Sequence, residues 1–135
     1  MSSYVDIFFH EDEGFKILAQ YQTWRTAMLN SAVANKRETF SYVEKHKETD
    51  EVFVLLKGKA FLVIGGDSGK PDSFEVLPLD LFKTYNVKVN VWHGVLMSSD
   101  ASIYIVENIA TGKPNSDYYY LTQEEKETII SRVLF

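Results

Sequence analysis

The sequence predicts an all-β fold, a sandwich or barrel of short strands, followed by one C-terminal helix. Runs of β-branched and aromatic residues recur at short intervals and are separated by loops that contain glycine and proline. The last residues change to a helical period. The chain has 135 residues, of which 45% are hydrophobic, so it has the size of one domain with one core.

The first element, FKILAQYQTWRTAMLN at 15–30, fits two patterns. Phe15, Ile17 and Tyr21 lie at the alternating positions of a strand, whereas Ile17, Tyr21 and Trp24 also fall at helical spacing. We favour strands, because the sequence that follows is rich in β-formers. Trp24 is expected in the core on either interpretation.

The clearest strands lie at 51–64, EVFVLLKGKAFLVI. Two β-branched and aromatic runs meet at Lys57 and Gly58, which predicts a β-hairpin with the glycine at positive φ. GGDSGKPDS at 65–73 is expected to be the next loop.

Three further runs, FEVLPLDLF, YNVKVNVWHGVLM and ASIYIVEN, complete the predicted barrel core at about 15–110. In the tail, LTQEEKETIISRVLF, Thr122 and Glu125 form a capping box before an apolar stripe. We therefore expect a helix at about 122–134, packed outside the barrel, in a single domain that covers residues 1–135.

Composition argues against several classes of protein. The chain has 14 Lys and Arg against 19 Asp and Glu, a formal charge of −5, and nucleic acid needs a basic face. It has no cysteine, which excludes disulfides and thiolate metal sites and favours the cytoplasm. The N-terminus lacks the basic start of a signal peptide, and no segment approaches the roughly 20 apolar residues of a membrane span.

The stretch VEKHKETDE at 43–51 contains the candidate site. Residues two apart on a strand share a face, so Glu44 and His46 point the same way, and Glu51 opens the next strand beside His46. His93 on a later strand can supply a second imidazole. Two histidines and two carboxylates suit a divalent iron, manganese, nickel or zinc ion. The simpler alternative is a solvated acidic turn before a hairpin, with His93 as a hydrogen-bonded core histidine.

At these residues the sequence resembles the cupin superfamily. The first cupin motif is glycine, five residues, His, one residue, His, three or four residues, Glu, six residues, glycine. His46, Glu51 and Gly58 match its second histidine, its glutamate and its last glycine. Glu44 occupies the place of the first histidine, and Glu38 occupies that of the leading glycine.

The second cupin motif is proline, one residue, glycine, two residues, His, three residues, asparagine. His93 matches its histidine, whereas Lys88, Asn90 and Met97 stand at the other three places. The resemblance spans roughly residues 40–108, and its specific part is the first motif.

The resemblance implies a double-stranded β-helix jelly roll, a metal held by Glu44, His46, Glu51 and His93, and a homodimer formed through an edge strand or an exchanged N-terminal strand. It implies no organic cofactor and identifies no catalytic residue. Two functions remain open. One is a metal-dependent enzyme that acts on a small polar metabolite, such as a sugar, a ureido compound or a keto or hydroxy acid. The other is a non-catalytic module that binds a small ligand without metal.

Overall fold

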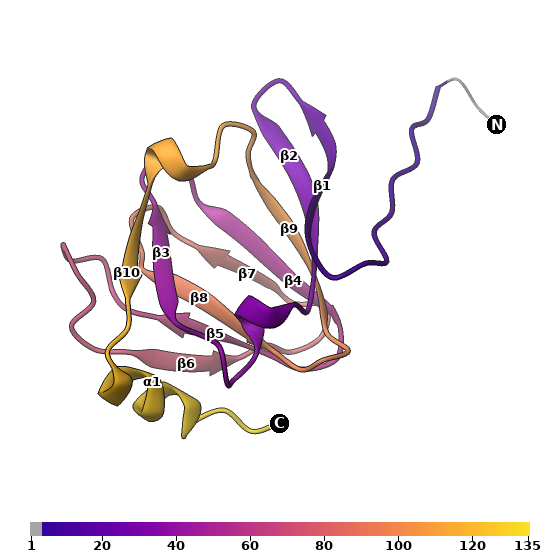
Figure 1. Cartoon of the computed structure of the whole chain (residues 1–135). Coiled ribbons are helices and arrows are strands. Elements are labelled where there is room, and N and C mark those ends of the chain that lie inside the picture. Colours follow the sequence, from indigo (N-terminus) through magenta and orange to yellow (C-terminus); the bar gives the residue numbers. More distant parts are fainter. Residues whose placement is uncertain (1–3) are drawn as a thin grey trace.

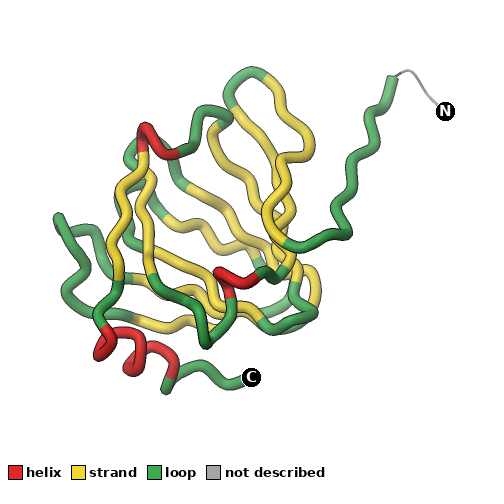
Figure 2. Tube along the Cα trace, viewed as in Figure 1, coloured by secondary structure: helices red, strands yellow, loops and turns green. Residues whose placement is uncertain are grey.

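The computed structural model describes residues 4–135, so residues 1–3 of the predicted domain lie outside the described residues. The described chain forms two five-stranded antiparallel sheets that face each other, with one helix outside (Figure 1). The first sheet has the order β1-β2-β9-β4-β7, and the second has the order β10-β3-β8-β5-β6. This is the predicted jelly-roll barrel. Loops connect the strands at both ends of the barrel (Figure 2).

The strands are β1 (Gly14–Tyr21), β2 (Trp24–Asn30), β3 (Tyr42–His46), β4 (Glu51–Lys57), β5 (Ala60–Ile64), β6 (Glu75–Pro78), β7 (Thr84–Val87), β8 (His93–Met97), β9 (Ser102–Asn108) and β10 (Ser116–Tyr120). Two 3₁₀ turns, η1 (Val33–Asn35) and η2 (Lys113–Asn115), and the helix α1 (Gln123–Ile130) complete the fold. The ambiguous segment 15–30 is thus two paired strands, as favoured from its β-rich context. Trp24 was expected in the core, but it is 44% exposed at the start of β2.

The prediction of a hairpin at 51–64 is wrong. β4 pairs with β7 and β9 in one sheet, whereas β5 pairs with β6 and β8 in the other. Gly58 does have positive φ (76°), and a Cβ there would lie 2.6 Å from the Cα of Ala101. The turn therefore moves the chain from one sheet to the other against a neighbouring turn. Two apolar runs joined by a glycine cannot distinguish such a corner from a hairpin, because both have the same local pattern.

The helix is shorter than the expected 122–134. It ends at Ile130, and the backbone N–H groups of Arg132 and Val133 bond three residues back, to Ile129 and Ile130, in a tight turn. Its buried residue Ile129 packs with Val133 and residues on the outer face of the second sheet. No helix among residues 4–135 is long and apolar enough to span a membrane.

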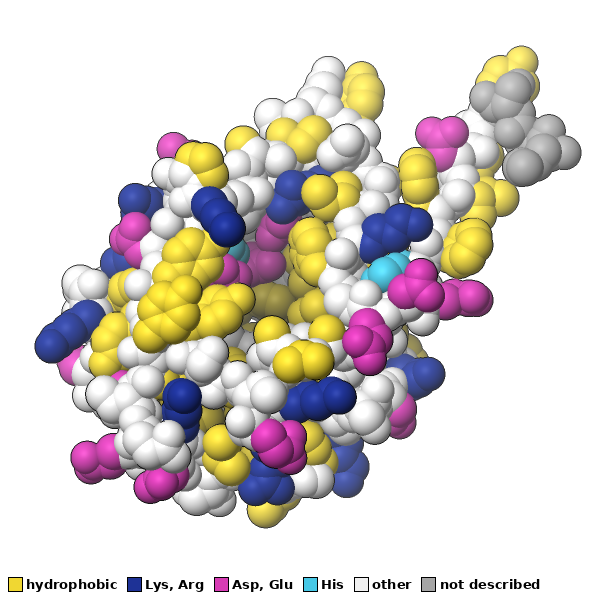
Figure 3. Space-filling view, viewed as in Figure 1, with side chains coloured by type: hydrophobic (Ala, Val, Ile, Leu, Met, Phe, Trp, Pro, Cys, Tyr) yellow, Lys and Arg dark blue, Asp and Glu magenta, His cyan; other side chains and the backbone are white. Residues whose placement is uncertain are grey.

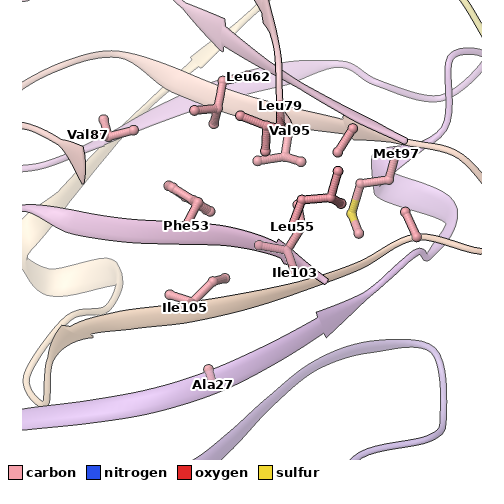
Figure 4. Close-up of a cluster of buried hydrophobic side chains, with 12 residues drawn as sticks. Ala27, Phe53, Leu55, Leu62, Leu79, Val87, Val95, Met97, Ile103 and Ile105 are labelled. Atoms are coloured by element: carbon pink, nitrogen blue, oxygen red, sulfur yellow. The ribbon is translucent and has the colours of Figure 1, made fainter. Parts of the chain in front are cut away.

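The core between the sheets occupies one end of the barrel (Figure 4). Inward side chains alternate along the central strands, as on β4 with Phe53 and Leu55 and on β9 with Ile103 and Ile105. Toward the other end of each strand, the same inward positions hold charged residues, Glu51 on β4 and Glu107 on β9. The candidate site lies at that end.

Candidate metal centre

A cavity of about 400 Å³ opens between the two sheets beyond the apolar core. Figure 3 shows this hollow with acidic side chains inside it and hydrophobic side chains along its rim. The four residues predicted from the sequence all line it: Glu44, His46, Glu51 and His93. Glu44 and His46 alternate on β3, while Glu51 and His93 are the first residues of β4 and β8.

The polar atoms of these four residues converge on one point. Oε1 of Glu51 lies 3.0 Å from Nε2 of His46 and 2.9 Å from Nε2 of His93. Oε1 of Glu44 lies 3.7 Å from Nε2 of His46. Glu51 and both histidines are buried, whereas the side chain of Glu44 is 32% exposed and faces the opening.

The other ring nitrogen of each histidine fixes its orientation. Nδ1 of His46 lies 2.8 Å from the hydroxyl of Ser116, and Nδ1 of His93 lies 2.9 Å from the carbonyl oxygen of Val91. A carbonyl only accepts, so Nδ1 of His93 carries a proton and donates it. In a neutral ring, Nε2 then presents a lone pair to the carboxylate of Glu51. Two acceptors at this distance need a cation between them, either a proton or a metal ion.

The charges around Glu51 shift its pKa and those of the histidines. Burial alone would raise the pKa of Glu51, but hydrogen bonds from His46 and His93 outweigh it and hold that pKa well below its usual range. Burial lowers the pKa of both imidazoles, but the hydrogen bond and negative charge of Glu51 bring both pKa values above the ordinary value. Glu51 is therefore an ionised carboxylate between two basic rings.

Two further charged residues belong to the site and were missed from the sequence. Glu107 on β9 is the cross-strand neighbour of both Glu51 on β4 and Arg25 on β2. Nε of Arg25 donates to Oε2 of Glu107 at 2.9 Å, and its Nη2 and Nη1 also donate to the carbonyls of Thr111 and Ile109. Arg25, Glu107 and Glu51 thus form a buried row across the first sheet.

In this row the carboxyl groups of Glu51 and Glu107 lie side by side on neighbouring strands. Burial raises the pKa of Glu107, the hydrogen bond and charge of Glu51 raise it further, and Arg25 offsets part of this, leaving a pKa of about 7. The sequence did contain a signal for Glu107. It lies two residues beyond Ile105 and four beyond Ile103, so the alternation of the strand places its side chain inside the barrel with theirs. Arg25 likewise alternates with the buried Ala27.

The donor set suits a divalent metal ion. Ligand atoms of Glu44, His46 and His93 lie within 4.8 Å of one another, and so do those of His46, Glu51 and Glu107. Imidazole nitrogen and carboxylate oxygen are ligands of iron, manganese, nickel and zinc. The bond from His93 to a backbone carbonyl is the usual support of a ligating histidine. Arg25 is the one arginine or lysine lining the cavity among residues 4–135, facing three carboxylates, so a bound cation would reduce an unfavourable charge balance.

Comparison with solved structures agrees with the fold. A cupin-2 domain protein from Shewanella frigidimarina matches with a TM-score of 0.53 at 18% identity, over 74% of this chain and 84% of that one. A Streptomyces PAC13 variant solved with uridine matches with a TM-score of 0.58 at 9% identity, over 86% and 88%. KdgF from Halomonas sp. matches with a TM-score of 0.52 at 12% identity, over 72% and 78%. At such identities these likenesses concern the fold alone.

Comparison of sequences is more specific. Ureidoglycolate lyase 2 of Rhizobium meliloti (strain 1021) is 29% identical over 89 residues, which are 61% of this chain and 53% of that protein. The match therefore spans about half the length of that relative. The profile of the ureidoglycolate lyase family matches residues 9–127, which include every strand and all six charged residues of the site. This chain is a member of the ureidoglycolate lyase family, built on the cupin barrel.

Proposed function

We propose that this protein is a metal-dependent lyase acting on a small ureido-substituted 2-hydroxy acid, with ureidoglycolate as its substrate. The observation that carries the proposal is the carboxylate oxygen of Glu51, shared by His46 and His93 inside the cavity. The family match over residues 9–127 supports this substrate class among those expected from the sequence.

Glu44, His46, Glu51 and His93 would hold the ion. A divalent ion there supplies Lewis-acid polarisation of the hydroxyl and carboxylate oxygens of the substrate. It also offsets the negative charge of the cavity, which would otherwise repel an anionic substrate. A 2-hydroxy acid is suited to such a site, because its two oxygens lie close together on neighbouring carbons.

The reaction needs one proton moved from oxygen to nitrogen. The hydroxyl proton leaves, its O–H electrons form the new C=O bond, and the C–N bond breaks with its electron pair going to the ureido nitrogen. That nitrogen takes up a proton, which gives urea and a 2-oxo acid. Glu107 would carry this proton, a role supported by its pairing with Glu51, its position outside the proposed ligand set and the hydrogen bond that it accepts from Arg25.

The test combines metal content with product release. Protein purified without chelators is analysed by elemental mass spectrometry, loaded in turn with Mn²⁺, Fe²⁺, Zn²⁺ and Ni²⁺, and assayed for urea and glyoxylate from ureidoglycolate. We expect near-stoichiometric metal and activity in the wild type and neither in a His46→Ala/His93→Ala variant. His10→Ala is the matched control, because His10 lies outside this cavity.

One observation favours a second function. A proton on each imidazole satisfies the contacts to Glu51 without any metal, and the raised pKa values of His46 and His93 are in keeping with that state. A folded wild type that binds no metal and releases no urea would contradict the lyase and favour the non-catalytic ligand-binding module.

We also propose a homodimer, with a second copy covering the N-terminal segment Tyr4–Phe9. This segment runs away from the barrel (Figure 1), and its side chains Val5, Ile7, Phe8 and Phe9 are 50–74% exposed. β1 and β10 are also edge strands of their sheets. Light scattering should give a dimer for the wild type and for Asp6→Ala, and a monomer for Ile7→Asp/Phe9→Asp. An equal mass for wild type and double variant would contradict this interface.

A further inference from the structure

The cavity wall formed by β3 and β10 changes character from the floor to the opening. Three cross-strand pairs follow one another along it: His46 with Ser116 at the floor, then Glu44 with Tyr118, then Tyr42 with Tyr120. The charged metal centre is therefore followed by an aromatic rim on the same wall.

Tyr42 and Tyr118 line the cavity, whereas Tyr120 does not and is 71% exposed. The rings of Tyr42 and Tyr118 pack edge to face, with centroids 5.9 Å apart, and remain 36% and 38% exposed. Within residues 4–135, neither phenolic hydroxyl has a hydrogen-bond partner. Each thus presents a ring face and an unused donor and acceptor to whatever enters the cavity.

We propose that Tyr42 and Tyr118 form the subsite for the planar ureido end of the substrate. The inference rests on the proposed lyase function and deepens it by assigning the orientation of the substrate and two specificity-determining residues. The hydroxy acid end lies on the floor, at the metal centre. The ureido end lies against the tyrosine rings, toward the opening.

Charge and shape support this orientation. The floor holds three carboxylates, two imidazoles and Arg25, and a hydroxy acid bound to a cation neutralises part of that charge. A ureido group is neutral and planar, so it gains little from the cation but can stack on an aromatic face and hydrogen-bond to a phenol. Phe15 and Leu29 of the other sheet also line the cavity and add apolar surface to it. The cavity of about 400 Å³ has room above the floor for the whole ureido end.

The test separates the two ends of the substrate with two inert ligands. Hydantoate (N-carbamoylglycine) has the carboxylate and the ureido group but no hydroxyl to eliminate from, and glycolate has only the hydroxy acid end. Calorimetric titration of the 135-residue chain in the presence of Mn²⁺ gives the affinity for each. We expect the ratio of hydantoate to glycolate affinity to fall roughly threefold to tenfold in Tyr42→Ala and in Tyr118→Ala.

Three controls decide the interpretation. Tyr42→Phe and Tyr118→Phe keep the ring and should retain most of the ratio, losing at most the contribution of one hydrogen bond. Tyr120→Ala removes a ring that contacts Tyr42 but lies outside the cavity, and it should leave the ratio unchanged. Should an alanine variant fail to fold, the leucine variant, which keeps apolar bulk and removes the ring, is judged by the same ratio.

The outcomes distinguish this inference from the lyase proposal. An unchanged ratio in folded Tyr42 and Tyr118 variants would overturn the subsite and leave the lyase intact. A wild type that binds neither ligand would overturn the lyase and the subsite together. A ratio that falls equally in Tyr120→Ala would mean that the tyrosines act as a packed surface cluster, which also overturns the subsite.

Discussion

The two ends of the barrel interior are built from the same strands but hold opposite kinds of residue. β4 carries Glu51 at one end of its inward face and Leu55 at the other, and β9 carries Glu107 and Ile103 in the same way. At one end the side chains fill the space between the sheets, whereas at the other they leave a cavity bordered by charges. The alternation that builds a core also builds the site. The two ends differ in their effect on stability. The apolar residues at one end stabilise the fold, whereas the buried charges at the other end cost stability.

The largest expected effect tests the core end. Leu55→Ala removes a side chain that is 1% exposed and should lower the free energy of unfolding by about 2–5 kcal/mol, measured in urea. Metal content per folded protein should stay at the wild-type level, since Leu55 lies outside the cavity.

Leu81→Ala is the matched control, because Leu81 is 50% exposed and its truncation should change stability by less than about 0.5 kcal/mol. Loss of metal from folded Leu55→Ala protein would mean that the two ends are coupled through the shared strands. The apolar end and the charged end could then not be treated as independent.

The next effect tests the site end in chelator-treated protein. Arg25→Leu leaves the carboxylates of Glu107 and Glu51 opposed without their cation and should cost roughly 1–3 kcal/mol of stability. Adding Glu107→Leu removes the uncompensated charge, so the double variant should recover most of that loss.

After metal is restored to the wild type and both variants, both variants should lack lyase activity, because the proposed proton carrier is misplaced in one and absent in the other. A double variant that is less stable than Arg25→Leu would show that the pair stabilises the fold. The charged end of the barrel would then stabilise the fold as the apolar end does, and the contrast between the two ends would be wrong.

The smallest effect is expected from a change in the helix α1, outside the barrel, which should alter neither the apolar core nor the metal centre. Thr122 accepts a hydrogen bond from the backbone N–H of Glu125 at 3.1 Å, and the Glu125 side chain accepts one from the N–H of Thr122. Thr122→Ala should therefore lower the free energy of unfolding by about 1 kcal/mol, with metal affinity and lyase activity unchanged.

Thr128→Ala, within the same helix and exposed, is the matched control and should be neutral or stabilising by up to about 0.5 kcal/mol. A loss of metal on removal of the cap alone would indicate that α1 helps to hold β8 and its His93 in place.

Much of the site was predictable from spacing within single strands. Glu44 and His46 share a face because strand residues alternate, and Glu51 follows after a turn too short to carry it elsewhere. His93 came from a later strand and matches the histidine of the second cupin motif, and the structure brings it within 2.9 Å of Glu51. The predicted metal, homodimer, cytoplasmic location and absence of nucleic acid as a partner are not tested by the fold and stay predictions.

Other features depended on which strands become neighbours. The local pattern at 51–64 is the same for a hairpin as for a corner between sheets, so only the pairings of β4 and β5 with other strands distinguish them. The row Arg25, Glu107 and Glu51 joins residues up to 82 positions apart, and it exists because β9 lies between β2 and β4. The sequence by itself determined most of the strands, the capped helix and four of the six charged residues of the site. The tertiary structure decided the rest, because cross-strand contacts depend on sheet order and register, which no local pattern contains.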